Sequence, residues 1–171
     1  MAGKSKRKSD AFPLPKKWMP WIFLALSFLL YLNTVQHGFV LDDAIVITEN
    51  KFTKQGIEGW SGILTKDTFF GFFQKEGKDQ LVAGGRYRPF SLLFFSLIYE
   101  VAGDQPTVYH FFNLLFYGFL VVLLYLWLLR LFKKQKYRYW MASLATLIFA
   151  VHPVHTEVVA NIKGMDEIFA L

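Results

Sequence analysis

Two adjacent carboxylates, Asp42 and Asp43, lie in the stretch HGFVLDDAIV, a few residues after the apolar segment WMPWIFLALSFLLYL. A carboxylate at the mouth of a membrane helix bundle can stay ionised while partly shielded from water, which suits a general base. The alternative is that both acids are solvated and cap a helix or pair with Lys and Arg. Their adjacency alone does not separate the two interpretations.

Cations and imidazoles follow along the chain. In GGRYRPF, Arg86 and Arg88 carry guanidinium groups that match phosphate oxygens bidentately, although simple anchoring to lipid headgroups is the alternative. The histidines of HPVHTE, His152 and His155, have a spacing that fits no specific zinc pattern, and Pro153 interrupts it. Phosphate binding or helix capping is therefore favoured for them over metal binding.

One more acid stands at the entrance to an apolar segment. Asp166, in GMDE, is a candidate N-cap or a second acid of a catalytic site. No cofactor is assigned, but a divalent metal that bridges Asp42 and Asp166 is left open, since paired carboxylates suit hard cations. The chain has no cysteine, which excludes thiol nucleophiles and thiolate metal sites.

Composition places these residues in a membrane protein. Of the 171 residues 54% are hydrophobic and 19% aromatic, and the mean hydropathy is +0.30, above the usual value for a soluble domain. The net charge of +6 lies in short clusters that flank apolar runs. We interpret it as an orientation signal for a membrane protein and not as a nucleic-acid surface.

The apolar runs predict an all-α, polytopic membrane helical bundle. The basic clusters, in residues 1–17 and 133–138, are expected on the cytoplasmic side. The run PFSLLFFSLIYEVA, residues 89–102, is about 14 residues long and too short for a full span, so we place it as a juxtamembrane helix on the outer face. If it spanned instead, HPVHTE would lie on the opposite side from the acid pair. The spacing of apolar residues in TKQGIEGWSGIL predicts a further short amphipathic helix after a Thr53 cap, and a loop that packs on the membrane is the alternative.

The sequence thus predicts a cytoplasmic amino terminus and an outer face that carries all the motifs above. It also ends inside an apolar start, IFAL, which we expect to be a cut through a larger protein. The predicted order is a basic cytoplasmic tail 1–17, a first transmembrane helix 18–34, an outer loop 35–106, a second transmembrane helix 107–132, a basic cytoplasmic turn 133–138, a third transmembrane helix 139–151, a second outer loop 152–167 and a fourth transmembrane helix from 168.

The order of motifs resembles a known family over about residues 30–171. LDD after the first span, RYRPF before a short apolar helix, H followed by FFNLL, and FAVHPVHTEVVANIKGMDEIFAL are similar to the amino-terminal part of the TMTC proteins. These are transmembrane and tetratricopeptide-repeat O-mannosyltransferases, which with their bacterial relatives belong to the GT-C glycosyltransferase superfamily. HPVHTEVVA followed by a glycine and an aspartate is the most specific element.

The resemblance implies a membrane glycosyltransferase that moves a mannose-like sugar from a polyprenyl- or dolichyl-phosphate donor to an acceptor hydroxyl. It implies catalytic acids at Asp42, Asp43 and Asp166, and phosphate contacts at Arg86, Arg88, His152 and His155. The implied partners are membrane lipid, the lipid-phosphate sugar and a protein acceptor. The site would face the periplasm or the ER lumen, and a bacterial inner membrane is favoured.

Two features of this chain depart from the family pattern. Gly164, Met165 and Asp166 stand where many relatives have GR-x-D, and the later spans and tetratricopeptide repeats are absent, so we expect the 171 residues alone to be inactive. The alternatives are a non-catalytic membrane scaffold and a transporter fragment. A transporter usually carries charges at mid-span, whereas these spans hold little beyond Asn113.

Overall fold

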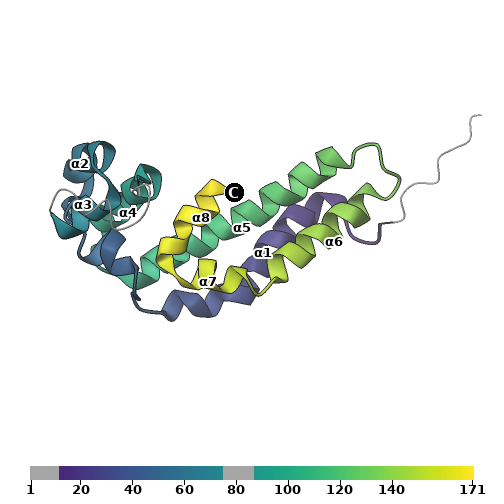
Figure 1. The fold of residues 1–171 in the computed structure, drawn as a ribbon. Coiled ribbons are helices and arrows are strands. Elements are labelled where there is room, and N and C mark those ends of the chain that lie inside the picture. The colour runs from purple at the N-terminus through teal and green to yellow at the C-terminus, as the bar shows by residue number, and fades with distance from the viewer. Residues whose placement is uncertain (1–11, 75–86) are drawn as a thin grey trace, which may run out of the picture.

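A computed structural model describes residues 12–74 and 87–171 of the chain, and every regular element in these two stretches is helical. Figure 1 shows an elongated molecule in which three helices lie side by side and a group of shorter helices sits at one end. The all-helical architecture predicted from the sequence is confirmed.

The long part of the molecule consists of α1 (Met19–Tyr31), α5 (Pro106–Leu131) and α6 (Arg138–Val151), which run alongside one another (Figure 1). Short 3₁₀ segments, Lys16–Trp18 and Leu32–Gln36, extend α1 at both ends. The resulting helix of 21 residues and the 26 residues of α5 are long and apolar enough to cross a membrane.

The predicted third span coincides with α6, but this helix has only 14 residues. At a rise of about 1.5 Å per residue it is about 21 Å long, which is shorter than the roughly 30 Å hydrocarbon core of a bilayer. The helix is therefore where the sequence placed it, and its crossing of a membrane stays a prediction.

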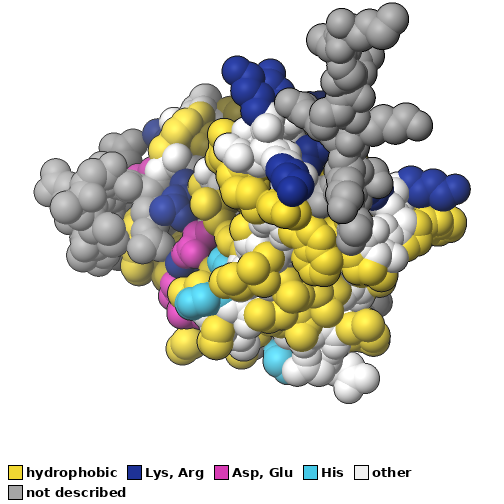
Figure 2. Space-filling model, turned by 90° about the vertical axis from the view of Figure 1, so that its right-hand side faces the viewer, with side chains coloured by type: hydrophobic (Ala, Val, Ile, Leu, Met, Phe, Trp, Pro, Cys, Tyr) yellow, Lys and Arg dark blue, Asp and Glu magenta, His cyan; other side chains and the backbone are white. Residues whose placement is uncertain are grey.

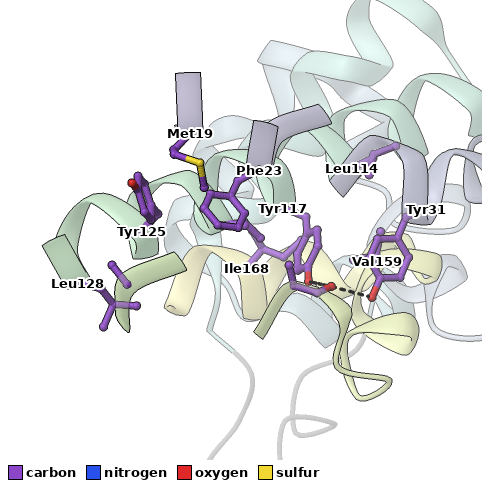
Figure 3. Packing of buried hydrophobic residues seen from close by; sticks show 12 residues of the cluster. Met19, Phe23, Tyr31, Leu114, Tyr117, Tyr125, Leu128, Val159 and Ile168 are labelled. Atoms are coloured by element: carbon purple, nitrogen blue, oxygen red, sulfur yellow. Dashed lines mark hydrogen bonds between the residues drawn. The ribbon is translucent and has the colours of Figure 1, made fainter. Parts of the chain in front are cut away.

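Large side chains fill the space between these helices. Figure 3 shows Phe23 of α1 beside Tyr125 of α5, whose ring centroids lie 5.0 Å apart. The hydroxyl groups of Tyr31 and Tyr117 both donate to the carbonyl of Ala150 near the end of α6, over 3.5 Å and 3.1 Å (Figure 3). One carbonyl thus ties all three helices together.

A close approach of α1 and α5 depends on Gly118. A Cβ atom at this position would lie 2.7 Å from Leu24 Cδ1 of α1, which is closer than carbon atoms pack. Small residues at helix crossings let the backbones come together in this way.

The short helices form a separate layer at the end of the bundle away from the α5–α6 turn (Figure 1). They are α2 (Trp60–Thr65), α3 (Thr68–Phe73) and α4 (Pro89–Ala102), preceded by a π-helical turn at Ala44–Thr48 and a 3₁₀ segment at Thr53–Gly59. A second cluster of buried apolar side chains joins α4 to the π-helical turn and to α5.

Helix α4 has the bounds that the sequence predicted, residues 89–102. Pro89 begins it and Gly103, with a φ of 59°, ends it. In Figure 1 it lies with α2 and α3 and not among the three long helices. Its placement as a juxtamembrane helix on the outer face stays a prediction.

The prediction of a short helix that begins after a Thr53 cap is wrong in its start and its cap. The α-helix in this segment, α2, begins only at Trp60. Thr53 does not cap it, because the Thr53 hydroxyl donates to the carbonyl of Val46 over 2.7 Å. Gly56, with a φ of 60°, interrupts the segment in a backbone conformation that glycine adopts readily.

The chain returns toward the acid pair through α7 (His155–Ala160), a 3₁₀ turn at Ile162–Gly164 and α8 (Met165–Ala170), which lies beside α5 (Figure 1). At the other end of the bundle Phe12 packs against Tyr139 and Trp140. The segment before α1 and the α5–α6 turn therefore share one end, as the placement of both basic clusters on one side requires.

Candidate functional site

The acid pair follows an unusual turn at the end of the first long helix. Leu41, directly before Asp42, has a φ of 41°, a backbone conformation that is uncommon for a residue with a side chain. Such conformations persist where the surrounding structure holds them, and they concentrate at functional sites. After this turn the two neighbouring carboxylates are held in different surroundings.

Asp43 is fully buried. Its Oδ2 accepts a hydrogen bond from the backbone N–H of Val40 over 2.9 Å, and its Oδ1 accepts one from the backbone N–H of Lys163 over 3.0 Å. Burial raises the pKa of the Asp43 carboxyl above its ordinary value, while these two N–H donors act in the opposite direction. Asp43 thus joins the first loop to the turn at residues 162–164.

Asp42 is the accessible acid of the pair. Its side chain is 48% exposed, and its Oδ2 lies 2.8 Å from Nζ of Lys163, which is 19% exposed. Lys163 therefore contacts both acids, Asp43 through its backbone N–H and Asp42 through its ammonium group. No role for Lys163 could be read from the sequence, because its partners lie about 120 positions earlier in the chain.

Asp166 is held at the start of α4. Nη1 of Arg88 lies 3.2 Å from its Oδ2, and the hydroxyl of Ser91 donates to its Oδ1. The Asp166 side chain is only 8% exposed, whereas that of Arg88 is 50% exposed. Gly164 precedes α8 as the N-cap, so the alternative role of Asp166 as an N-cap is wrong. Arg86 lies outside the described residues.

Arg88 and Lys163 open onto one polar cavity. It has a volume of about 190 Å³, and the charged side chains that line it are Asp42, Arg88, Glu157, Lys163 and Glu167. A neighbouring cavity of about 440 Å³ is lined by Arg88, Ser91, Asp166 and Glu167. The two cavities share Arg88 and Glu167. The structure thus places Asp42 and Arg88 at one cavity and Asp166 at the neighbouring cavity.

The predicted histidines do not line either of these cavities. Nδ1 of His152 accepts a hydrogen bond from the backbone N–H of Val154 over 3.2 Å. The ring of His155 lies 4.2 Å from that of Phe149, centroid to centroid. Burial, and then the nearby His152, lower the pKa of His155. A role of the two histidines at a phosphate stays a prediction.

Asn113 of α5 supports the site from within the bundle. Its side chain is fully buried, and its Nδ2 donates to the carbonyls of Val158, Val159 and Asn161 over 3.0, 3.0 and 3.1 Å. These carbonyls end α7 and begin the turn that carries Lys163, and a helix leaves its last carbonyls without partners of its own. A polar residue inside an apolar span was the available signal for this role.

A metal that bridges Asp42 and Asp166 stays a prediction. Each carboxylate already contacts a cation of the chain, Lys163 or Arg88. Within residues 12–74 and 87–171 no group of three or more acidic or histidine side chains could hold a metal ion. The chemistry proposed below uses the side chains of the chain itself.

The fold and the site together define a class. Two helices are long enough to span a membrane, and the segments that follow and connect them hold a cluster of paired acids and cations, Arg88 with Asp166 and Lys163 with Asp42. The molecule is a helical membrane protein in which these paired acids and cations lie at one end and the basic turn lies at the other (Figure 1).

Sequence comparison finds relatives of one kind. Protein O-mannosyl-transferase TMTC3 of Homo sapiens is 31% identical over 140 residues, and Tmtc1 of Drosophila melanogaster is 34% identical over 145 residues. TMTC4 of Mus musculus is 30% identical over 165 residues. Over the matched region the chain is related to these TMTC protein O-mannosyl-transferases.

The matched region is most of this chain but a small part of each relative. It covers 82%, 84% and 91% of this chain and 14%, 16% and 22% of TMTC3, Tmtc1 and TMTC4. No protein-family model matches the sequence, and no solved structure matches it.

Proposed function

We propose that this chain is part of an integral-membrane glycosyltransferase of the GT-C type. It transfers a mannose-like sugar from a polyprenyl- or dolichyl-phosphate donor to a hydroxyl group of a protein acceptor. The reaction takes place on the periplasmic or lumenal face, with a bacterial inner membrane favoured, and the basic end of the bundle is cytoplasmic. The relatives are named as protein O-mannosyl-transferases, which supports the reaction class.

Asp42 is the proposed general base. It removes the proton of the acceptor hydroxyl while the hydroxyl oxygen forms a bond to the anomeric carbon of the sugar. The bond from that carbon to the phosphate oxygen breaks, its electron pair stays on the phosphate, and the lipid phosphate leaves as an anion. A stable anionic leaving group needs a cation and not a general acid, and this is the role proposed for Arg88.

The observation that carries the proposal is the shared polar cavity. Asp42, 48% exposed, and Arg88, 50% exposed, both line it and can both reach a ligand there. Asp43, in contrast, is buried, and backbone N–H groups occupy both of its oxygens. This difference supports Asp42 as the base and Asp43 as the residue that fixes the loop. Asp166 is proposed as an acid that orients Arg88.

The test measures sugar transfer from a polyprenyl-phosphate mannose donor by the complete gene product, because the chain matches only a small part of each relative. Asp42→Asn keeps the shape of the side chain and removes its basicity, so turnover should fall about 10²–10⁴-fold while donor binding changes little. Arg88→Lys should mainly weaken donor binding, since an ammonium cannot reproduce a bidentate fork.

Asp67→Asn is the matched control for the loss of a charge. Asp67 accepts from the N–H of Phe70 at the start of α3, and Asn performs this capping role equally well. Its turnover should equal that of the parent. Full activity of Asp42→Asn would refute the assignment of the base, and a gene product without transferase activity would favour the scaffold or transporter alternative.

A further inference from the structure

An apolar groove lies at the basic end of the bundle, away from the site described above. It has a volume of about 460 Å³ and lies between α1 and α6, beside the segment Phe12–Leu14. Ile22 and Leu26 of α1 face Trp140 and Leu144 of α6 across it. Ser143 contributes the one polar side chain among the residues that line it in the described part of the chain.

Two cations meet at one ring beside this groove. Nζ of Lys16 lies 4.2 Å from the ring centroid of Tyr139, and the guanidinium carbon of Arg138 lies 4.7 Å from the same centroid. Nη2 of Arg138 also donates to the Tyr139 hydroxyl over 2.9 Å. Tyr139 directly precedes Trp140, which lines the groove, so both cations stand at its rim.

Within the described parts of the three long helices, no acid compensates this positive charge. Residues 12–36 and 106–156, which include the whole of α1, α5 and α6, contain no Asp or Glu. Figure 2 views the molecule from this end and shows Lys and Arg side chains above a broad hydrophobic surface, while the acidic side chains lie apart, on the left. The basic end therefore attracts anions and has no internal partner for its charge among these residues.

Exposed tryptophans show at which depth the groove would lie in a membrane. Trp18, Trp21 and Trp140 are 53%, 63% and 48% exposed, and all three lie at the basic end of α1 and α6. Tryptophan is enriched where the hydrocarbon core meets the headgroups. The rim of the groove is therefore at headgroup level, and its apolar walls run toward the hydrocarbon.

We propose that this groove is a binding site for an anionic phospholipid. An acyl chain fills the space between α1 and α6, and the headgroup phosphate contacts Lys16 and Arg138 at the rim. Basic pockets between membrane helices bind anionic headgroups in this way. A neighbouring apolar helix would fill the groove equally well but would leave the two cations without an anionic partner. This site is independent of the proposed transferase function.

The purified 171-residue chain can be titrated in a neutral detergent with dioleoylphosphatidylglycerol and dioleoylphosphatidylcholine, and the bound lipid counted by native mass spectrometry. The two lipids have the same acyl chains and differ in headgroup charge. A Lys or Arg near an anionic lipid contributes about five-fold in affinity, equivalent to about 1 kcal/mol. Two such residues should favour phosphatidylglycerol about 25-fold, and the preference should fall with added salt.

Matched variants separate the groove from general surface attraction. Lys16→Gln with Arg138→Gln should abolish the preference for phosphatidylglycerol. Lys133→Gln with Lys134→Gln removes the same charge from the exposed α5–α6 turn and should leave the preference in place. Leu144→Trp fills the groove and should lower the amount of lipid bound without changing the thermal unfolding midpoint.

Three results would overturn the proposal. The first is equal binding of the two lipids by the parent chain. The second is an equal loss of preference in the two double variants, which would mean diffuse attraction to the whole basic end. The third is undiminished lipid binding by Leu144→Trp, which would place the lipid outside the groove or leave the groove to a helix.

Discussion

Asn113 offers the sharpest test of how the bundle holds the polar site. In Asn113→Leu the side chain keeps nearly its size and loses its amide. The amide has only two N–H bonds for the three carbonyls that it contacts, so the change removes two full hydrogen bonds. Its Oδ1 has no hydrogen-bond partner within the described stretches, so its removal adds no cost.

The expected magnitude follows from these two bonds. Each buried carbonyl left without a donor costs about 1–1.5 kcal/mol. The loop from Val158 to Gly164 should therefore open more easily by about 2–3 kcal/mol, which corresponds to a factor of about 30 to 150 in its opening equilibrium. Backbone N–H groups that report this opening are those of Lys163 and Gly164, both hydrogen-bonded in the closed loop.

Amide hydrogen exchange of the 171-residue chain in detergent measures this opening. Exchange at Lys163 and Gly164 should accelerate by the stated factor, while exchange in the middle of α1 and α5 stays at the parental rate. Thr146→Val is the matched control, because Thr146 is also buried in a long helix but its hydroxyl has no hydrogen-bond partner within the described stretches. Unchanged exchange of the loop in Asn113→Leu, or a uniform increase over the whole chain, would show that the Asn113 hydrogen bonds do not hold this loop closed.

Two further predictions concern the acid pair and the histidines. Asp43→Asn should lower the free energy of unfolding by about 1–3 kcal/mol, because an amide presents its NH₂ to one of two backbone N–H donors. Chemical denaturation measures this change, with Asp67→Asn as the control, because an amide can keep the single N–H contact of Asp67. Equal stability of the two variants would contradict the prediction. The lowered pKa of His155 means that the fold disfavours its protonated form. Its contribution to stability is therefore present above the ordinary histidine pKa of about 6.5 and is lost as pH falls below that value. The thermal midpoint should fall more between pH 7.5 and 5.5 in the parent than in His155→Phe, and parallel pH curves would show that His155 is not responsible.

Local sequence signals were sufficient for the helices that begin and end with strong markers. Pro89 and Gly103 bound α4, and a long, mostly apolar run defines α5, so both could be placed from residue types alone. The start of α2 could not, because it depends on the backbone of Gly56 and on a bond from the N–H of Ile57 to Glu100, 43 positions later.

The site was predictable in its residue types and not in its pairings. The sequence indicated Asp42, Arg88 and Asp166 as chemically capable groups. It could not show that Arg88 contacts Asp166, 78 positions away, or that Lys163 contacts Asp42, 121 positions away. Such pairs arise from the packing of α4 and α8 around α5, and a single sequence carries no local signal for that packing.

The carbonyl of Ala150 has a consequence for the direction of the chain. With hydroxyl donors from Tyr31 on one side and Tyr117 on the other, its two lone pairs are both occupied, so α6 cannot turn about its own axis without breaking one of the bonds. The backbone leaves α6 only one residue later, at Val151. The direction in which the backbone leaves α6 is thereby fixed, and with it the starting direction of the segment that begins at His152. A swivel of α6, if one occurred in a membrane, would have to carry α1 and α5 with it.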